Sequence, residues 1–388
     1  MSALFPTYQN PILKPERGKG SWLWDGLGNS YLDFTSGLGV CQLGHVPEEV
    51  KDRVISQIDR LWHTSNLFEI EPQQKLAEEL VKISGLQAVF FANSGAEANE
   101  AAIKLARRYQ QRVKNRSSYQ VITFVQSFHG RTLATLTATG QDKVKDGFAP
   151  LPEGFINVPY GDIEALEGAI NEHTAAIMLE VIQGEGGINL ADEVWLKEVA
   201  KLANDNDILL IIDEVQTGIG RTGKWFGFQH YSIKPDIITV AKGLGSGFPI
   251  GAMIGSEKTK EAFAPGTHGS TFGGNFIATT AGLATIETIR NNNILENVQQ
   301  TEIFLLDLLK EELAIFPEMV EIRGKGLMIG IEWRQPVSEL IQVAKNNGLL
   351  VLSAGPNVLR LLPPLNISKD EVDLGVEKLL ISIREWQK

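Results

Sequence analysis

Apolar residues in the central part of the chain come in short continuous runs, which alternate with stretches of helical periodicity such as EANEAAIKLARRYQQR and VWLKEVAKLANDN. The apolar runs do not alternate with polar residues, and this is typical of strands that are covered on both faces in a parallel α/β sheet. The runs that we expect to be strands span residues 87–92, 120–125, 175–181, 208–212, 236–241 and 250–255.

The two ends of the chain have a different pattern from the centre. Residues 21–35 predict a hairpin around the turn from Gly26 to Asn29. Towards the C-terminus, long helical patterns lead to three short apolar segments, GLMIGIEW, GLLVLS and VLRLLPPL. The stretch that follows these segments opens with Ser368 and Glu371 at the spacing of a capping box, which predicts an amphipathic helix to the end of the chain.

These patterns predict an α/β fold with two domains. The length of 388 residues is sufficient for two or more layers around a large core. We expect a large domain of residues 51–275 around a mostly parallel central sheet. A smaller α+β domain is expected from both termini, residues 1–50 and 276–388.

The amino-acid composition limits the classes of binding partner that we expect for this protein. The formal net charge of −11 argues against a nucleic acid and against an anionic membrane surface. No apolar run approaches the ~18 residues of a membrane helix, and the N-terminus lacks the apolar region of a signal peptide. The single cysteine, Cys41, excludes an internal disulfide, so we expect a cytoplasmic protein. The six His residues are scattered and no HExxH or CxxC occurs, so no metal site is expected.

We expect ligand-binding residues directly after the predicted strands, because ligands of open α/β sheets bind beyond the carboxyl ends of the strands. After residues 87–92, Ser94 and Glu97 have capping-box spacing, and Gly95 allows a ligand to approach the backbone. The N-terminus of a helix with free N–H groups is suited to a phosphate. An ordinary helix cap explains the same motif equally well.

The other strand ends carry several kinds of polar group. Each has an ordinary explanation by itself, such as core packing for the ring, a loop turn for a carboxylate or solvation for a charged side chain. In a parallel sheet, however, these loops converge on one crevice. The groups are Phe128, His129 and Arg131 after 120–125, Glu185 after 175–181, Asp213 and Gln216 after 208–212, and Lys242 after 236–241.

Pyridoxal phosphate (PLP) is a ligand that uses this whole set. Its phosphate requires N–H donors, its ring a stacking partner, its phenolic oxygen an amide and its aldehyde an amine such as Lys242. We expect Asp213 to face the pyridine nitrogen, because a carboxylate in a dehydrated site favours the protonated ring. The neighbouring Glu214 is expected to point to the other side of the strand and to serve the structure.

One motif favours a different class of protein. Residues 218–223, GIGRTG, match the G-x-G-x-x-G pattern of dinucleotide-binding sites. That fingerprint opens a helix directly after a strand, whereas here DEVQT intervenes and the aromatic stretch KWFGFQHY follows. A nicotinamide-dependent oxidoreductase is therefore disfavoured.

The chain resembles the class-III (ornithine-type) aminotransferases of the fold-type I PLP enzymes. The similarity extends over nearly the whole chain and includes YLDFTSGLGVCQLGH, FANSGAEANEAAIKLARRY, SFHGRT, EVIQGEGGI, GTHGSTFGGN and LRLLPPL. The combination of DEVQTGIGRTG with AKGLGSGFPIGA is highly specific. The resemblance implies the PLP-transferase fold of type I and an obligate homodimer with active sites at the interface.

The resemblance also implies roles in cofactor binding. Lys242 is the catalytic residue, which links to the cofactor aldehyde and then moves a proton between the substrate and the cofactor. The implied cofactor-binding residues are Ser94, Gly95 and Ala96 at the phosphate, Phe128 on the ring, Asp213 at the pyridinium, Gln216 at the phenolic oxygen, Glu214 and Val215 between these two in the sequence, and Thr271 at the phosphate of the neighbouring subunit's cofactor.

Substrate-binding residues are implied in the same way. Arg131 would bind the carboxylate of an acetylated substrate, and Arg360 the α-carboxylate of glutamate or 2-oxoglutarate. Glu185 would pair with Arg360 when the ω-amino substrate is bound and release it for glutamate. Ser270 would lie close to the substrate of the neighbouring subunit.

The implied reaction is transfer of the δ-amino group of N2-acetylornithine to 2-oxoglutarate, which gives N-acetylglutamate semialdehyde and glutamate in arginine biosynthesis. Ornithine and 4-aminobutyrate are the alternative amino donors. A non-catalytic binding protein of this fold would lack Lys242, Arg131 or Arg360, and all three are present. Two positions depart from the family pattern: Phe276 stands where proline is frequent, and Phe68 replaces an aromatic residue that carries a hydroxyl.

Overall fold

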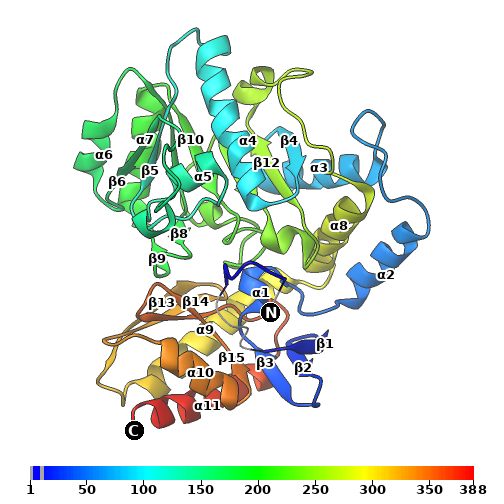
Figure 1. Cartoon of the computed structure of the whole chain (residues 1–388), viewed down its shortest axis with the longest axis vertical. Helices are drawn as coiled ribbons and strands as arrows, with labels where there is room; N and C mark the ends of the chain where they lie inside the picture. The colour runs from blue at the N-terminus through cyan, green and yellow to red at the C-terminus, as the bar shows by residue number, and fades with distance from the viewer. Residues whose placement is uncertain (1–2, 9–12) are drawn as a thin grey trace.

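A seven-stranded sheet forms the centre of the larger lobe in the computed structural model, which describes residues 3–8 and 13–388 (Figure 1). Its strands are β4 (Ala88–Ala92), β5 (Gln120–Phe124), β6 (Phe155–Val158), β7 (Thr174–Leu179), β10 (Leu209–Asp213), β11 (Ile237–Val240) and β12 (Gly251–Gly255). They lie in the order β4-β12-β11-β10-β7-β5-β6. All neighbouring pairs are parallel except β11 with β12 and β12 with β4.

All six strands expected from the apolar runs are present, so the mostly parallel sheet is confirmed. Strand β6 was missed, because it is a short strand at the edge of the sheet and most of its residues are only half-buried. Strand β12 is antiparallel to both of its neighbours. Strand β4 consequently runs in the same direction as β11, and all six strands other than β12 direct their carboxyl ends to one edge of the sheet.

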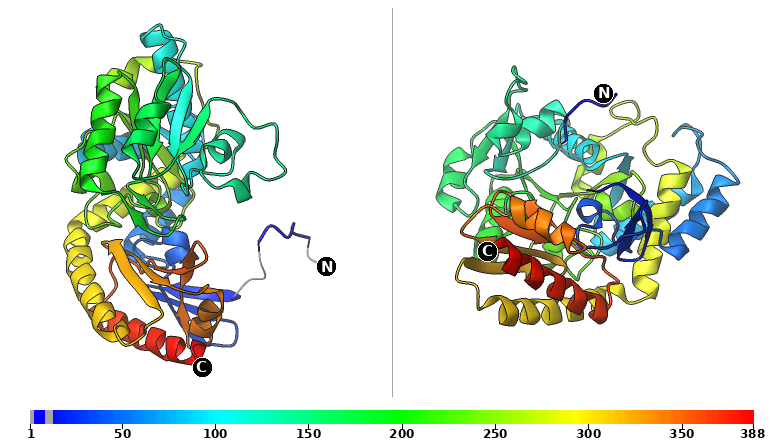
Figure 2. Two further views of the ribbon diagram at one scale, coloured as in Figure 1. Left: turned by 90° about the vertical axis from the view of Figure 1, so that its left-hand side faces the viewer. Right: turned by 60° about the horizontal axis from the view of Figure 1, so that its bottom comes forward.

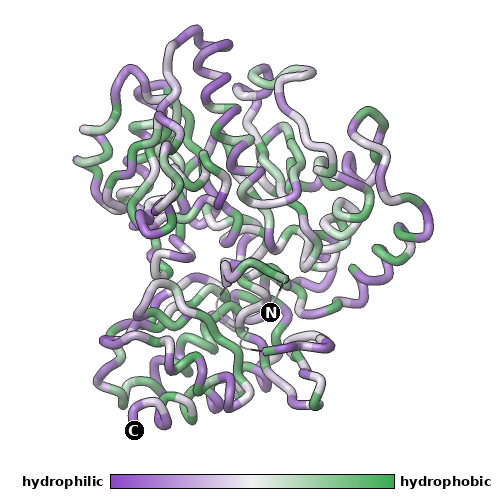
Figure 3. Tube along the Cα trace, in the orientation of Figure 1, coloured by the Kyte–Doolittle hydropathy of each residue, from purple (hydrophilic) through white to green (hydrophobic). Residues whose placement is uncertain are grey.

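The apolar runs are continuous because the central strands are covered by helices on both faces, and every residue of β7 and β10 is buried. In Figure 3 the central strands are mostly hydrophobic, whereas the helices around them mix hydrophobic and hydrophilic residues. The helices of this lobe are α2 (Glu48–Ile58), α3 (Glu71–Ser84), α4 (Gly95–Arg108), α5 (Leu133–Ala138), α6 (Ile163–Ala169), α7 (Glu193–Asp205) and α8 (Phe276–Asn291), and α4 continues into the π-helical turn Tyr109–Val113.

The smaller lobe combines the two ends of the chain (Figures 1 and 2). One sheet has the order β1-β2-β3-β15 and the other β13-β14-β17-β16, so an N-terminal hairpin pairs with a C-terminal strand. The strands are β1 (Pro15–Lys19), β2 (Trp22–Asp25), β3 (Ser30–Asp33), β13 (Met319–Lys325), β14 (Met328–Trp333), β15 (Leu349–Leu350), β16 (Leu352–Ala354) and β17 (Val358–Leu361). The helices are α1 (Ser36–Gly39), α9 (Ile294–Leu313), α10 (Ser338–Asn346) and α11 (Lys369–Trp386).

Two local predictions at the ends are confirmed. Strands β2 and β3 form the expected hairpin, and Ser368 and Glu371 form a capping box at the start of α11. The same Glu371 carboxylate accepts hydrogen bonds from Ser21 Oγ (3.2 Å) and Trp22 Nε1 (3.0 Å). The capping residue of the last helix therefore also holds the N-terminal hairpin.

The division into domains at residue 275 stays a prediction. Helix α8 begins at Phe276, directly after the expected boundary, and packs against α2 and α3 of the larger lobe. The remaining short elements are β8 (Ile182–Gln183), β9 (Asn189–Leu190) and the 3-10 turns Asp142–Val144, Gly227–His230, Lys242–Gly245 and Glu257–Ala262. Among the described helices, none combines the length and the apolar character that a membrane crossing requires.

Packing between the two ends of the chain generates a first prediction. A methyl group at Gly375 in α11 would lie 2.2 Å from the ring of Phe34, whose side chain is buried. We expect Gly375→Ala to lower the free energy of unfolding by about 1–3 kcal/mol, because the ring has no room to move. Gly168→Ala in α6 is the matched control, since no atom lies within 4 Å of its added methyl. The control is expected to be neutral or stabilising by up to about 1 kcal/mol. Urea unfolding midpoints that are equal for the two variants would contradict the prediction.

Candidate active site

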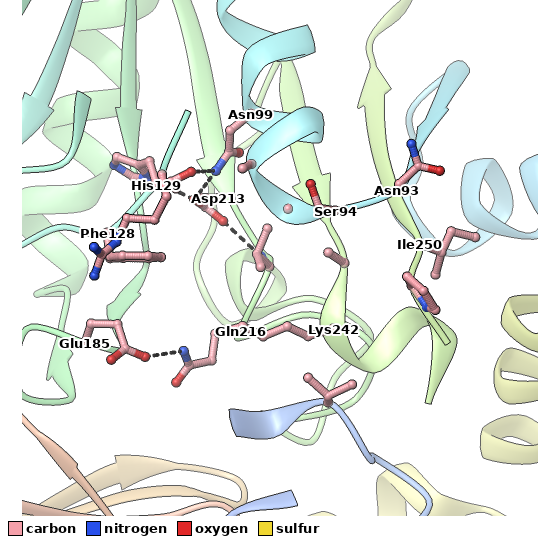
Figure 4. Close-up of a pocket in the computed structure, with 18 of the residues that line it drawn as sticks. Asn93, Ser94, Asn99, Phe128, His129, Glu185, Asp213, Gln216, Lys242 and Ile250 are labelled. Atoms are coloured by element: carbon pink, nitrogen blue, oxygen red, sulfur yellow. Dashed lines mark hydrogen bonds and ion pairs between the residues drawn. The ribbon is translucent and has the colours of Figure 1, made fainter. Parts of the chain in front are cut away.

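A cavity of about 430 Å³ lies at the carboxyl edge of the central sheet. It is lined by residues that follow β4, β5, β7, β10 and β11, as Figure 4 shows for several of them. Ten of the site residues expected from the sequence line this cavity: Ser94, Gly95, Ala96, Phe128, Arg131, Glu185, Asp213, Val215, Gln216 and Lys242. Glu214, Ser270, Thr271 and Arg360 lie outside this lining.

Asp213 is held rigidly at the end of β10. Its Oδ2 accepts a hydrogen bond from Asn99 Nδ2 (2.8 Å) and lies 2.8 Å from His129 Nδ1, and its Oδ1 accepts from the Val215 N–H (3.0 Å). Asn99 is fixed in turn, because its Oδ1 accepts from Thr239 Oγ1 (2.6 Å). The buried carboxylate is thus orientated by three elements, α4, β11 and the loop after β5.

Neither Asn99 nor Thr239 was identified from the sequence. The available signal was a polar residue among the alanines of the buried face of α4, where Asn99 is only 1 % exposed. His129, whose role the sequence left open, is part of the same network. Burial lowers the pKa of His129, but the carboxylates of Asp213 and Glu180 outweigh this effect and raise it above the ordinary value.

The N-terminus of α4 forms one wall of the cavity. Ser94 caps the helix, and its Oγ accepts from the Glu97 N–H (3.2 Å). The Glu97 carboxylate binds the N–H of Asn93 rather than that of Ser94, so the expected capping box is only half formed. A methyl group on Gly95 would lie 2.8 Å from Val215, which explains why glycine is required where the two loops meet. The first N–H groups of a helix have no partner within it, and they are therefore available to an anion.

Lys242 begins a 3-10 turn directly after β11. Its backbone adopts φ 37°, in the left-handed region that non-glycine residues rarely occupy and that is frequent at functional sites. Burial lowers the pKa of Lys242 and Arg360 adds to the effect, whereas Glu185 and Asp213 oppose it. The amine lies in the same cavity as Asp213 (Figure 4) and is easier to deprotonate than an ordinary lysine.

An ion pair connects the two lobes beside the cavity. Arg360 on β17 is 1 % exposed, and its Nη1 donates to Glu185 Oε1 (2.6 Å) and to the carbonyl of Gly184 (2.9 Å). Gln216 completes the cluster, because its Oε1 accepts from Arg360 (3.0 Å) and its Nε2 donates to Glu185 (3.3 Å). Burial raises the pKa of Glu185, but Arg360 and Lys242 overcome this effect and hold it below its ordinary value.

The Gln216 amide is therefore engaged with Glu185 and Arg360, although the sequence suggested a contact with the cofactor. Glu214 is directed away from the cavity, as its position on the strand suggested. Its carboxylate accepts hydrogen bonds from Thr217 Oγ1 (2.5 Å) and from two backbone N–H groups, those of Gly227 (2.8 Å) and Phe228 (2.7 Å). Burial raises the pKa of Glu214 to about 7.

Ser270 and Thr271 line a separate hollow of about 370 Å³ together with the exposed ring of Phe272. Their loop is held by Asn66, whose Nδ2 donates to the carbonyls of Ser270 (3.1 Å) and Gly273 (3.0 Å). Thr271 itself is exposed. Within one copy of the chain, these two residues do not line the main cavity, but Asn93 lines both hollows and its Nδ2 donates to Ser270 Oγ (3.3 Å).

Three other positions from the sequence analysis have defined surroundings. The GIGRTG segment forms turns, not the start of a helix, and its Arg221 donates to the carbonyls of Leu327 (2.9 Å) and Pro363 (2.6 Å). This does not fit a dinucleotide fingerprint. Phe276 starts α8 directly after the capping residue Asn275, and Phe68 is exposed.

The residues present fit PLP. The cavity combines a helix N-terminus for a phosphate, the ring of Phe128 and the carboxylate of Asp213, with the amine of Lys242 within the same lining. The guanidinium of Arg131 is exposed and lies 5.6 Å from the Phe128 ring centroid. Among the described residues, no group of three or more His, Cys, Asp or Glu side chains is placed to hold a metal ion.

Comparison with known proteins agrees with this geometry. The family model described as Aminotransferase class-III matches residues 5–382. The chain is 50% identical to an acetylornithine aminotransferase of Oceanobacillus iheyensis, over 97% of this chain and 95% of that protein. It is 49% identical to an acetylornithine aminotransferase of Bacillus subtilis, over 98% of this chain and 97% of the relative.

Solved structures of aminotransferases have the same fold. The ornithine aminotransferase of Toxoplasma gondii superposes with a TM-score of 0.95 at 31% identity, over 100% of this chain and 94% of that chain. The N-acetylornithine aminotransferase of Stenotrophomonas maltophilia gives a TM-score of 0.85 at 36% identity, over 98% and 97%. The chain therefore belongs to the class-III aminotransferase family and is a PLP-dependent transaminase.

Proposed function

We propose that this transaminase moves the δ-amino group of N2-acetylornithine to 2-oxoglutarate, giving N-acetylglutamate semialdehyde and glutamate in arginine biosynthesis. The observation that carries the proposal is one cavity that contains Lys242 and Asp213 and borders the Glu185–Arg360 pair. The relatives that are about half identical over nearly their whole length bear the name of this activity.

In this proposal, the cofactor supplies an electron sink for the bonds that break at the amine-bearing carbon of the substrate. Lys242 holds and moves the proton at its Nζ, which is favoured by the lowered pKa of its amine. The Asp213 carboxylate keeps the ring nitrogen protonated, and the hydrogen bonds from Asn99 and Val215 maintain its direction. The N-terminus of α4, with Ser94, Gly95 and Ala96, binds the phosphate.

Substrate selection depends on two guanidinium groups. Arg131 is exposed at the rim of the cavity and binds the carboxylate of the acetylated donor. Arg360 is neutralised by Glu185 while that donor is bound, and is released to bind the α-carboxylate of glutamate or 2-oxoglutarate. One pocket then accepts an ω-amino substrate and an α-amino acid in turn.

The working unit in this proposal is a homodimer in the cytoplasm. Exposed apolar side chains gather around the loop that carries Ser270 and Thr271, which we place at the partner's active site: Trp62, Leu67, Phe68 and Phe272 are 60 to 92 % exposed. Asn66 lies in the segment that carries Trp62, Leu67 and Phe68, and its side chain donates to the carbonyl of Ser270 in the loop. A second copy of the chain would cover this apolar surface.

Ornithine aminotransferase is the second candidate. It is favoured by the TM-score of 0.95 to an ornithine aminotransferase, whereas the higher identity to acetylornithine aminotransferases favours the acetylated donor. The two differ at the α-amino group of the donor, which is neutral when acetylated and charged when free.

An absorbance spectrum of the purified protein tests the proposal. We expect a band near the edge of the visible range that shifts when N2-acetylornithine is added, because the amine enters the cofactor site. A panel of donors then compares kcat/KM for N2-acetylornithine, ornithine and 4-aminobutyrate at fixed 2-oxoglutarate. The acetylated donor is expected to give the highest value. A higher kcat/KM for ornithine would assign the second candidate instead.

Replacement of the amine provides a more specific test. Lys242→Ala is expected to lower kcat by at least about 10²-fold, because Lys242 is the one lysine among the described residues that line the cavity. Lys201→Ala, which removes an exposed lysine on α7, is the matched control and is expected to leave kcat unchanged. Stopped-flow measurement of the half-reaction with N2-acetylornithine is the readout. Turnover of Lys242→Ala at the wild-type rate would refute its assignment.

The ion pair generates a prediction about substrate preference. Glu185→Ala leaves Arg360 without its carboxylate partner, so the half-reaction with glutamate should be favoured over that with N2-acetylornithine by about tenfold or more. Glu167→Ala, an exposed carboxylate on α6, serves as the control. Single-turnover rates for the two half-reactions measure the preference. An unchanged ratio in Glu185→Ala would eliminate the proposed switch.

A further inference from the structure

Glu180 is a buried carboxylate that the sequence analysis did not assign and that lines the same cavity as Lys242 and Asp213. It follows β7 directly, and β7 lies between β5 and β10 in the sheet. Glu180 is only 6 % exposed. A carboxylate at this depth requires hydrogen-bond donors, and the identity of those donors suggests its role.

The two oxygens of Glu180 bind different walls of the cavity. Oε2 accepts from the N–H of Phe128 (3.0 Å), in the loop that presents the aromatic ring. Oε1 accepts from the N–H of Gly184 (3.2 Å), whose carbonyl in turn accepts from Arg360. Glu185 is the next residue along the chain. One side chain therefore connects the wall that carries the ring to the wall that carries the Glu185–Arg360 pair.

We propose that Glu180 is a positioning residue, whose ionised carboxylate sets the distance between the Phe128 loop and the Gly184–Glu185 loop and thereby the width of the cofactor slot. Only the ionised form presents two unprotonated oxygens to the two N–H groups. This inference rests on the proposed function for the nature of the ligand, but it concerns how this chain shapes the slot and not which amino donor it uses.

The charge of Glu180 is sensitive to its surroundings. Burial and the neighbouring Asp213 raise the pKa of Glu180, His129 and the two N–H groups lower it, and the result is about 7. The charged amine of Lys242 also acts on this carboxylate, and the hydroxyl of Tyr160 donates to the carbonyl oxygen of Glu180 (2.8 Å). The ionised fraction of the carboxylate therefore increases from pH 6 to pH 8.

The test uses Glu180→Gln, which keeps the size of the side chain but presents an amide N–H₂ to one of the two donors. The readout is the dissociation constant of PLP, measured by equilibrium dialysis at pH 6 and pH 8. We expect the variant to bind PLP about tenfold more weakly than the wild type at pH 8, and less than about threefold more weakly at pH 6, where the wild type has lost its second unprotonated oxygen.

Glu214→Gln is a matched control. Glu214 is a second buried carboxylate at the end of a neighbouring strand, accepts two backbone N–H bonds and has a pKa of about 7, but it is directed away from the cavity. The ratio of the PLP dissociation constant of Glu214→Gln to that of the wild type should not increase from pH 6 to pH 8. If Glu180→Gln fails to fold, Glu180→Asp keeps the charge but is one carbon too short to reach both donors. That variant should bind PLP about tenfold more weakly at pH 8.

A Glu180→Gln protein with wild-type affinity at pH 8, or with an equal loss at both pH values, would overturn the proposed role of Glu180. An equal pH effect in Glu214→Gln would also overturn it. A wild-type protein that binds no PLP would instead overturn the proposed function, so the two failures are distinguishable.

Discussion

The site depends on holding a carboxylate in a fixed direction at the buried edge of an apolar sheet. Removal of a charge from water is costly unless donors replace the solvent. Asp213 receives hydrogen bonds from the Asn99 side chain and the Val215 N–H and lies beside His129, so its direction is fixed before any ligand binds. These groups come from a helix, the loop after β5 and the segment after β10, and the central sheet and its helices must be in place for the carboxylate to be held.

A second constraint is the coupling of the two lobes. Arg360 belongs to β17 of the smaller lobe, whereas Glu185 and Gln216 follow strands of the larger lobe. Arg221 adds a further link, because it donates to backbone carbonyls at Leu327 and Pro363. The guanidinium to which we assign substrate selection is therefore positioned by the interface between lobes.

The parts of the fold that were predicted from the sequence are those governed by local pattern. The six apolar runs, the N-terminal hairpin and the capping box of Ser368 and Glu371 depend on periodicity and on neighbouring residues. Strand β6 was missed because an edge strand buries too little to leave a continuous apolar run. Gln216 lines the cavity as expected, and its role at the cofactor stays a prediction; its contact with Arg360 could not be predicted, because the two residues are far apart in sequence.

The sequence by itself determined the central strands, the polar groups that follow them and the aminotransferase family, because these are encoded in contiguous segments. The tertiary structure alone decided which of those groups share a cavity. Strand β12 is inserted antiparallel, so the carboxyl ends of β4 and β11 reach the same edge. Asn99, Thr239 and Glu180 acquire their roles from partners on other elements, and hydrogen bonds between distant segments leave no local trace in a single sequence.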